Sequence, residues 1–361
     1  MSSRLSSLRD AVGSFMMRRS VKAMAFIAIV VLLWWSVDWK RTIILLVSAN
    51  PPWLMAAFLA LTLQTILSAL RWRLTAKPLA IALTMPQAVR EYYLAQMVNQ
   101  SLPGGIVGDA GRALRAKQQR GLLAASQSVI FERVAGQLGL LAVLLMGFLA
   151  ASLAPANVFP GAFPERPGWL GWGLLAVFIA SSAALVWMYQ RPNSATRRFS
   201  KTFFHTVFAN GAWMPQTALS LSTAICNVAA FAFCAAALGT HFGVIAMAVL
   251  FPLVLFAMLL PFSISGWGVR EGAAAALFPL FGASASEGLA ASLAFGLMFI
   301  ASTVCGVIIT AMRPTAATYA TVTDHEQPDS CDPDNPPPPL GSPARGPTPL
   351  SSGRKTDQKR G

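Results

Sequence analysis

Two short polar stretches interrupt an otherwise apolar chain, and each combines a proline, glycines and an arginine. The first, PGGIVGDAGR, runs from Pro103 to Arg112, and the second, PFSISGWGVRE, runs from Pro261 to Glu271. In both, a glycine follows the proline after five residues and an arginine after nine. A glycine-rich break before a helix directs backbone N–H groups and the positive end of the helix dipole into the break. Because arginine binds phosphate through paired hydrogen bonds, the pattern predicts recognition of an anionic group, with phosphate the best match.

Two further ionisable residues, Glu132 and Arg133, lie inside a long apolar run over residues 122–150. At 1.5 Å per residue they lie roughly 15 Å along a helix that begins with this run, a depth near the middle of a bilayer. Adjacent residues on a helix diverge by about 100°, so each of the two needs a partner elsewhere. We expect a buried counter-ion for Glu132, either Arg112 or Arg270.

Charged groups inside a bilayer cost about 2.5–3.5 kcal/mol each on insertion scales, so they need a partner or a function. Two interpretations stay open: a structural ion network with breaks that only kink helices, and an anion-binding site. Arg270 and Glu271 favour the second because they lie between two apolar segments with no loop nearby. Asp109 has a simpler alternative as the N-cap of the helix that follows it. The candidate substrate-binding residues are Gly104, Gly105, Gly108, Asp109, Arg112, Glu132, Arg133, Ser265, Gly266, Gly268, Arg270 and Glu271, with Pro103 and Pro261 as the helix-breaking positions.

The sequence offers no arrangement typical of catalysis or of a metal centre. It contains no Cys-x-x-Cys motif, and its three histidines are far apart and near no carboxylate cluster. Glu132 and Glu271 each have an arginine neighbour, which favours ionised, paired carboxylates over catalytic acids. We therefore expect a protein that is not an enzyme, with no catalytic residue, no metal and no cofactor. A membrane enzyme that uses the buried carboxylates is the weaker alternative.

Composition places these residues in a membrane protein. Of the 361 residues, 55% are hydrophobic and 12% are charged, whereas soluble proteins carry about 25% charged residues. The net charge of +14 could indicate nucleic acid binding, but most Lys and Arg lie between apolar runs, where they set membrane topology. We expect an all-α, polytopic helical membrane protein that binds no nucleic acid. Six apolar runs are predicted to cross the membrane fully: residues 23–37, 53–70, 122–150, 169–189, 216–238 and 287–312.

The two breaks are predicted to be the tips of re-entrant helix pairs. Thr84, followed by Pro86 and Gln87, indicates a capping box that starts a semi-polar helix over residues 84–102. A basic helix follows the first break, and an apolar run over residues 241–260 leads into the second. The two pairs would enter the membrane from opposite faces, as in transporters with inverted repeats. If either break is instead a full crossing, the C-terminus moves to the other side.

The charge distribution predicts three segments. Residues 1–22 form a basic cytoplasmic N-terminus, residues 23–313 the transmembrane domain, and residues 314–361 a disordered, proline-rich cytoplasmic tail. We expect the first apolar run to be an uncleaved signal anchor. With six crossings and two re-entrant pairs, the main basic clusters and both termini fall on the cytoplasmic side of a bacterial inner (plasma) membrane.

Three stretches resemble the transmembrane region of the lysylphosphatidylglycerol synthase family: residues 99–112, 128–133 and 261–271. The resemblance extends over roughly residues 20–312 and implies a flippase-like domain that moves lipid between leaflets. We expect a stand-alone member, because no aminoacyl transferase domain follows residue 313, and lysine transfer is therefore not carried over. Residues 290–298 lack an arginine that family members often have there. The matched polar positions are Asp109, Arg112, Glu132, Arg133, Arg270 and Glu271.

The resulting expectation is a lipid translocase that moves a phospholipid or another lipid between the leaflets of the inner membrane. Its expected partner is a membrane lipid with an anionic or phosphate-bearing headgroup. A second copy of the chain and a lipid-synthesis enzyme are the protein partners to consider. The alternative function is a non-catalytic helper subunit of a lipid, hopanoid or glycolipid synthesis pathway.

Overall fold

The computed structural model describes residues 37–102, 105–153, 199, 201–206, 211, 213–258 and 267–312. Within these ranges every regular element is a helix, as the composition predicts. The elements are α2 (Trp39–Val47), α3 (Pro51–Ala76), η1 (Lys77–Leu79), α4 (Met85–Ser101), α5 (Val107–Leu153), α8 (Trp213–Ala237), α9 (Val244–Ala257), α10 (Val269–Leu277), η4 (Phe278–Phe281) and α11 (Ala285–Met312).

Four of the described helices are long and apolar enough to cross a membrane: α3 with η1, α5, α8 and α11. They contain four of the six predicted crossings, at residues 53–70, 122–150, 216–238 and 287–312. The other two predictions, at residues 23–37 and 169–189, lie largely or wholly outside the described residues, and the predicted N-terminus and tail lie wholly outside them. The helices beside the two breaks are shorter: α4 has 17 residues, α9 has 14 and α10 has 9.

Side-chain caps fix where two of these helices begin. The Thr84 hydroxyl accepts a hydrogen bond from the Gln87 backbone N–H at 3.4 Å, and the Gln87 side chain accepts one from the Thr84 N–H at 3.1 Å. This capping box starts α4 and confirms the predicted boundary. Ser284 and Glu287 make the same reciprocal pair at the start of α11, with distances of 2.8 and 3.2 Å.

Helix α5 consists of two helical segments that meet at Arg120 and Gly121. Both residues leave the helical conformation, and Gly121 adopts a φ of 81°, a left-handed value that glycine takes without strain. The first segment, residues 107–119, is basic, whereas the second, residues 122–153, is the apolar span. The sequence predicts this second helix from Leu122, which agrees with the position of the bend.

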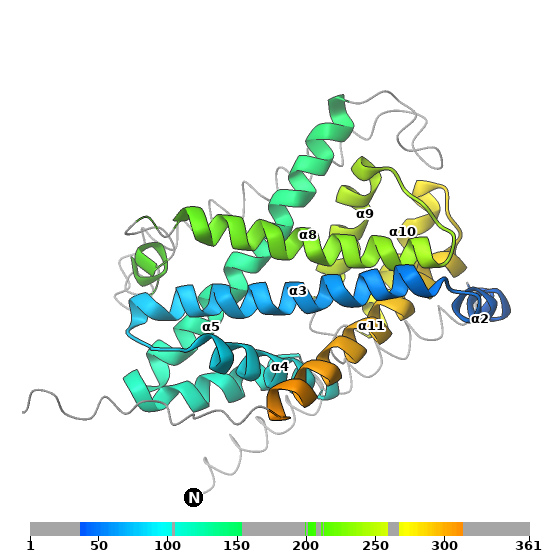
Figure 1. Cartoon of the computed structure of the whole chain (residues 1–361). Helices are drawn as coiled ribbons and strands as arrows, with labels where there is room; N and C mark the ends of the chain where they lie inside the picture. The colour runs from blue at the N-terminus through cyan, green and yellow to red at the C-terminus, as the bar shows by residue number, and fades with distance from the viewer. Residues whose placement is uncertain are drawn as a thin grey trace, which may run out of the picture. The chain divides into compact units, whose positions relative to one another are not determined.

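The helices pack closely where glycines remove side chains from the contact. Helices α3 and α8 lie side by side along most of their length, and α5 crosses this pair (Figure 1). A Cβ atom on Gly139 of α5 would lie 2.6 Å from the Ser220 carbonyl carbon of α8. On Gly108 it would lie 2.7 Å from the Ala95 carbonyl carbon of α4. Small residues therefore allow close backbone approach, which drives helix association where water does not.

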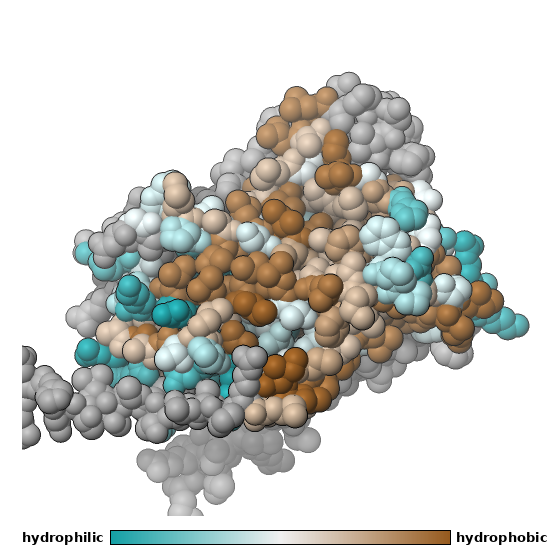
Figure 2. Space-filling model, viewed as in Figure 1, coloured by the Kyte–Doolittle hydropathy of each residue, from teal (hydrophilic) through white to brown (hydrophobic). Residues whose placement is uncertain are grey.

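One apolar core cluster joins α3, α5, α8, α9, α10, η4 and α11. Phe231 stacks on Phe251 and Phe295, with ring centroids 4.9 and 5.1 Å away, and Phe278 packs beside them. On the surface, apolar residues extend across the middle of the face that Figure 2 shows, and polar residues gather towards its sides. An apolar exterior over a packed aromatic core is the pattern expected of helices in lipid.

Candidate functional site

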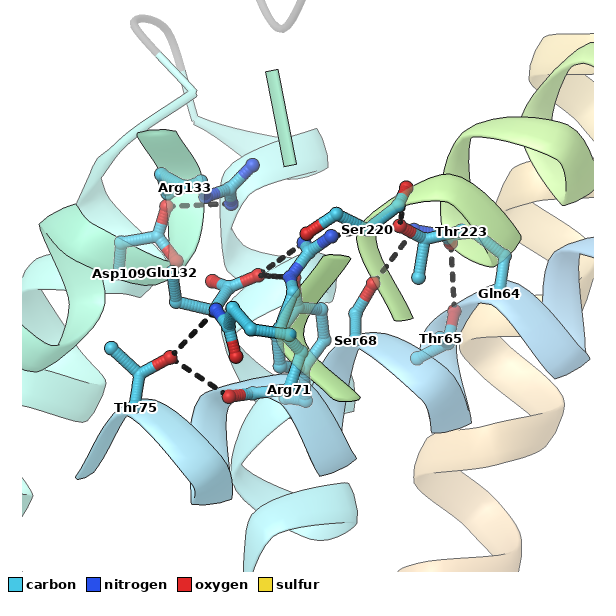
Figure 3. A network of polar contacts seen from close by, with 12 residues as sticks. Gln64, Thr65, Ser68, Arg71, Thr75, Asp109, Glu132, Arg133, Ser220 and Thr223 are labelled. Atoms are coloured by element: carbon cyan, nitrogen blue, oxygen red, sulfur yellow. Dashed lines mark hydrogen bonds and ion pairs between the residues drawn. The ribbon is translucent and has the colours of Figure 1, made fainter. Parts of the chain in front are cut away.

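A buried carboxylate, Glu132, belongs to a polar network that joins α3, α4, α5 and α8. Figure 3 shows members of this network on α3, α5 and α8. Its Oε1 accepts hydrogen bonds from Arg71 Nη2 at 2.6 Å and Nε at 3.2 Å, and from the Tyr92 hydroxyl at 3.2 Å. Its Oε2 accepts one from Arg112 Nη2 at 2.9 Å. One carboxylate is thus shared by two guanidinium groups, and each of these buried charges has an ion-pair partner.

The Arg112 side chain is completely buried, and two aromatic rings enclose it. Its guanidinium carbon lies 4.8 Å from the Trp72 ring centroid and 4.7 Å from that of Tyr92. The Trp72 indole N–H donates to the Ser128 hydroxyl at 3.2 Å, which fixes the ring. Desolvated cation–π contacts of this kind hold a planar guanidinium in one orientation.

A second carboxylate, Asp109, connects this buried centre to the surface. Its Oδ1 lies 3.0 Å from Arg112 Nε, and its Oδ2 lies 2.6 Å from Nη2 of Arg133, whose side chain is 47% exposed. Asp109 lies within the first turn of α5, so the simpler alternative that it is the N-cap of this helix is wrong. Three guanidinium groups, from Arg71, Arg112 and Arg133, face two carboxylates, and the network carries one net positive charge.

Arg71 is not among the site residues that the sequence predicts, because it directly follows the apolar run over residues 53–70, where basic residues usually set membrane topology. The structure places Arg71 inside α3, five residues or about 8 Å before the end of that helix. Its Nη1 donates to the Thr223 hydroxyl of α8 at 2.7 Å. The available signal was a helical period of small polar residues, because Thr65, Ser68 and Thr75 share its buried face of α3.

A polar cavity of about 110 Å³ lies beside the network, between α3, α4, α5 and α8. Both Arg71 and Arg133 reach its wall. Glycine at position 136 gives the Arg71 guanidinium its space, since a Cβ there would lie 2.7 Å from Nη2. The described lining residues are Gln64, Arg71, Tyr92, Arg133, Gly136, Gln137, Leu140, Thr223, Ala224 and Asn227. The cavity therefore presents two cations and several neutral amides and hydroxyls inside an otherwise apolar bundle.

The helix start after the first break is held by a side-chain amide. Asn99 Oδ1 accepts a hydrogen bond from the Gly108 backbone N–H at 2.7 Å, so this N–H is already used inside the protein. Among the described residues, Asn99 Nδ2 and Arg112 Nη1 are buried without a hydrogen-bond partner. Two buried donors near one helix start favour an acceptor at this place. Gly105 adopts a φ of 62°, whereas Pro103 and Gly104 lie outside the described residues.

The second break leads into a separate and self-contained cluster. Glu271 Oε2 accepts a hydrogen bond from the Gly268 backbone N–H at 2.6 Å, and its Oε1 pairs with Arg270 Nη2. Ser292 of α11 binds both residues, at 2.9 Å from Arg270 Nε and 3.2 Å from Glu271 Oε1. Arg270 also lies over the Trp267 and Phe295 rings. This cluster has no net charge.

The structure corrects one expectation about these residues. Glu132 does not pair with Arg270; its counter-ions are Arg112, the other predicted arginine, and Arg71. Arg270 and Glu271 lie in the first turn of α10, which begins at Val269, so a helix begins directly after the second break, as the sequence predicts. Gly268 has a φ of 84°, while Pro261, Ser265 and Gly266 lie outside the described residues.

Helices long and apolar enough to span a membrane, joined by a buried ion network and a polar cavity, define a multi-pass helical membrane protein with a buried polar site. The family model of the lysylphosphatidylglycerol synthase TM region matches residues 21–306, and the chain belongs to this family. A comparison with curated proteins gives no match. In the part of the chain that the structure describes, no group of three His, Cys, Asp or Glu side chains could hold a metal ion.

Proposed function

We propose that this protein moves a lipid with an anionic, phosphate-bearing headgroup between the leaflets of the bacterial inner membrane, without catalysing a covalent reaction. The observation that carries the proposal is the net positive charge of the Glu132 network beside a polar cavity. A neutral ion network would suffice to hold helices together. An uncompensated guanidinium costs several kcal/mol in a bilayer and favours an anion that completes the charge balance.

The positions of the charges suggest how a headgroup is held. Glu132 is shared by Arg71 and Arg112, which are both buried and fixed by rings, hydroxyls and close packing. Arg133 is half exposed and has only Asp109 as its ion-pair partner among the described residues. Arg71 and Arg112 are held in place and make the electrostatic potential in the cavity positive. Arg133 can turn toward a phosphate at small cost in free energy. The two NH groups of its fork match two phosphate oxygens.

The cavity supplies what a polar headgroup needs on its way through lipid. Water gives such a headgroup hydrogen bonds, and hydrocarbon gives none, so a translocating protein must replace them. Side chains of Gln64, Thr223 and Asn227 line the cavity with donors and acceptors. The acyl chains can stay in the bilayer, because three of the helices around the cavity, α3, α5 and α8, are apolar enough to span a membrane.

The proposal is tested with purified protein in liposomes that contain a trace of head-labelled fluorescent phosphatidylglycerol. Dithionite, which cannot enter the vesicle, bleaches the outer leaflet, and translocation exposes the inner pool. Wild-type protein should accelerate the second bleaching phase over protein-free vesicles, and Arg71→Gln should abolish this acceleration. A wild-type rate equal to that of protein-free vesicles would overturn translocation and favour the helper-subunit alternative.

A further inference from the structure

The polar cavity contains cations but no unengaged carboxylate. Arg71 and Arg133 line it, and its other described lining residues are neutral. The nearest acidic groups, Glu132 and Asp109, each hold two guanidinium groups. A ligand that enters the cavity therefore meets positive charge without a compensating negative group.

We infer that this site binds lipids whose headgroup is net anionic, a phosphodiester followed by hydroxyl groups, and rejects headgroups that carry an ammonium group. The inference rests on the proposed lipid translocation and specifies its substrate class. An ammonium group a few ångströms from the phosphate would lie near Arg71 and Arg133. Like charges in a partly desolvated site repel strongly, because the local dielectric constant is far below that of water.

The size of the cavity supports recognition of the phosphodiester itself. Its volume of about 110 Å³ is several times the ~10–15 Å³ that a single water molecule requires. The cavity therefore has room for a small polar group such as a phosphate. Selection at this place therefore depends on the charge nearest to the phosphate.

Gln137 provides a contact that suits a hydroxyl group. Its Oε1 is buried beside the cavity and has no hydrogen-bond partner among the described residues. A buried acceptor without a donor is costly, so a donor from the ligand gains more here than at an exposed site. A headgroup hydroxyl supplies this donor without adding positive charge to a site that already has an excess of it.

The test measures binding of single lipids to the purified full-length protein in detergent by native mass spectrometry. The probes are phosphatidylglycerol, phosphatidylethanolamine and lysylphosphatidylglycerol with identical acyl chains, and inorganic phosphate as a separate arm. Wild-type protein should bind phosphatidylglycerol about tenfold or more tightly than the two ammonium-bearing lipids, a difference of about 1.4 kcal/mol or more. Phosphate should compete with phosphatidylglycerol only weakly if a lipid is the ligand. Full competition would show that the site prefers free phosphate to a lipid headgroup.

Two variants and one matched control locate the selectivity. Arg133→Gln removes the excess charge and should reduce the preference severalfold, while Gln137→Glu adds a carboxylate of the same size and should abolish or reverse it. Arg115→Gln is the control, because Arg115 lies on the same helix, is 43% exposed and pairs with one carboxylate, Glu91, away from the cavity. It should keep the wild-type preference. Monodisperse elution of each variant establishes that it folds.

The outcomes separate this inference from the proposed function. Equal wild-type affinity for all three lipids, or equal effects of Arg133→Gln and Arg115→Gln, would overturn the selectivity. If the vesicle assay shows translocation of ammonium-bearing lipids as fast as of phosphatidylglycerol, the selectivity is also wrong while translocation stands. Selective binding with no translocation would overturn the proposed function and leave a lipid-binding site.

Discussion

The two glycine-rich breaks look alike in sequence, yet the charges that follow them are compensated in different ways. After the first break, Arg112 reaches a carboxylate from the far segment of its helix and shares it with an arginine from α3. After the second, Arg270 pairs with the residue next to it and with a serine of α11. The first arrangement joins three helices and keeps a net charge, whereas the second is local and neutral.

This difference assigns distinct roles to the two regions. A local, neutral pair that also caps a helix has the properties of a structural element, since every charge is satisfied within a few residues. A network that spans several helices, carries excess charge and borders a cavity has the properties of a binding site. We therefore propose that the ligand's anionic group binds at the first region, and that Arg270 supports the fold around α10.

The largest effect is expected from the shared carboxylate. Glu132→Gln should lower the free energy of unfolding by about 3–5 kcal/mol, because two buried guanidinium groups lose their compensation. Glu271→Gln should cost less, since only Arg270 loses a carboxylate and Ser292 remains bound to it. Thermal unfolding of the detergent-extracted variants measures both, and equal losses would remove the distinction between the regions.

Double-mutant cycles test the partners directly. Glu132→Gln combined with Arg71→Gln should show an interaction energy of about 1–3 kcal/mol, as expected for residues in one network. Combined with Arg270→Gln, the same change should be additive to within about 0.5 kcal/mol. A coupling between Glu132 and Arg270 as large as that with Arg71 would contradict the separation of the two clusters.

A smaller effect is expected from the planar shape of the guanidinium groups. Arg112→Lys keeps the charge but loses the stacking between Trp72 and Tyr92, which should cost about 1–2 kcal/mol and slow lipid translocation. Arg270→Lys should leave the rate nearly unchanged in the same vesicle assay. Full activity of both variants would mean that charge alone matters at both positions.

The smallest effect on stability is expected at Gly136. An alanine there would bring its Cβ to 2.7 Å from Arg71 Nη2, so Gly136→Ala should displace the guanidinium, cost about 1 kcal/mol and reduce translocation. Gly111→Ala is the matched control on the same helix, because its Cβ would meet only the flexible end of Arg115 at 3.3 Å. This control should keep full activity, and a similar loss in both variants would show that the Arg71 position is unimportant.

Much of the fold could be predicted from the sequence because its signals are local. Apolar length indicates the spans, and the Thr84 and Ser284 caps indicate where α4 and α11 begin. The choice of ion partners could not be predicted, because spacing along the chain does not reveal which helices touch. Equal spacing after Pro103 and Pro261 indicated equal roles for two arginines, but the packing of α3 against α5 brings Arg71 to Glu132. The neutral cavity residues, such as Gln137 and Asn227, carry no pattern that distinguishes them from other polar residues in the spans.

Because α5 bends at Gly121, the ion network also connects the two segments of this helix. Helix α5 is two helical segments joined at Arg120 and Gly121. Asp109 and Arg112 lie on the first segment, and Glu132 and Arg133 lie on the second. The ion pairs between the two segments therefore hold them at a fixed angle across the bend. A phosphate that competes with Asp109 for Arg133 would break the Asp109–Arg133 ion pair. The Arg112–Glu132 ion pair would then be the remaining link between the two segments. Ligand binding in the cavity and the angle between the two segments of α5 are then coupled.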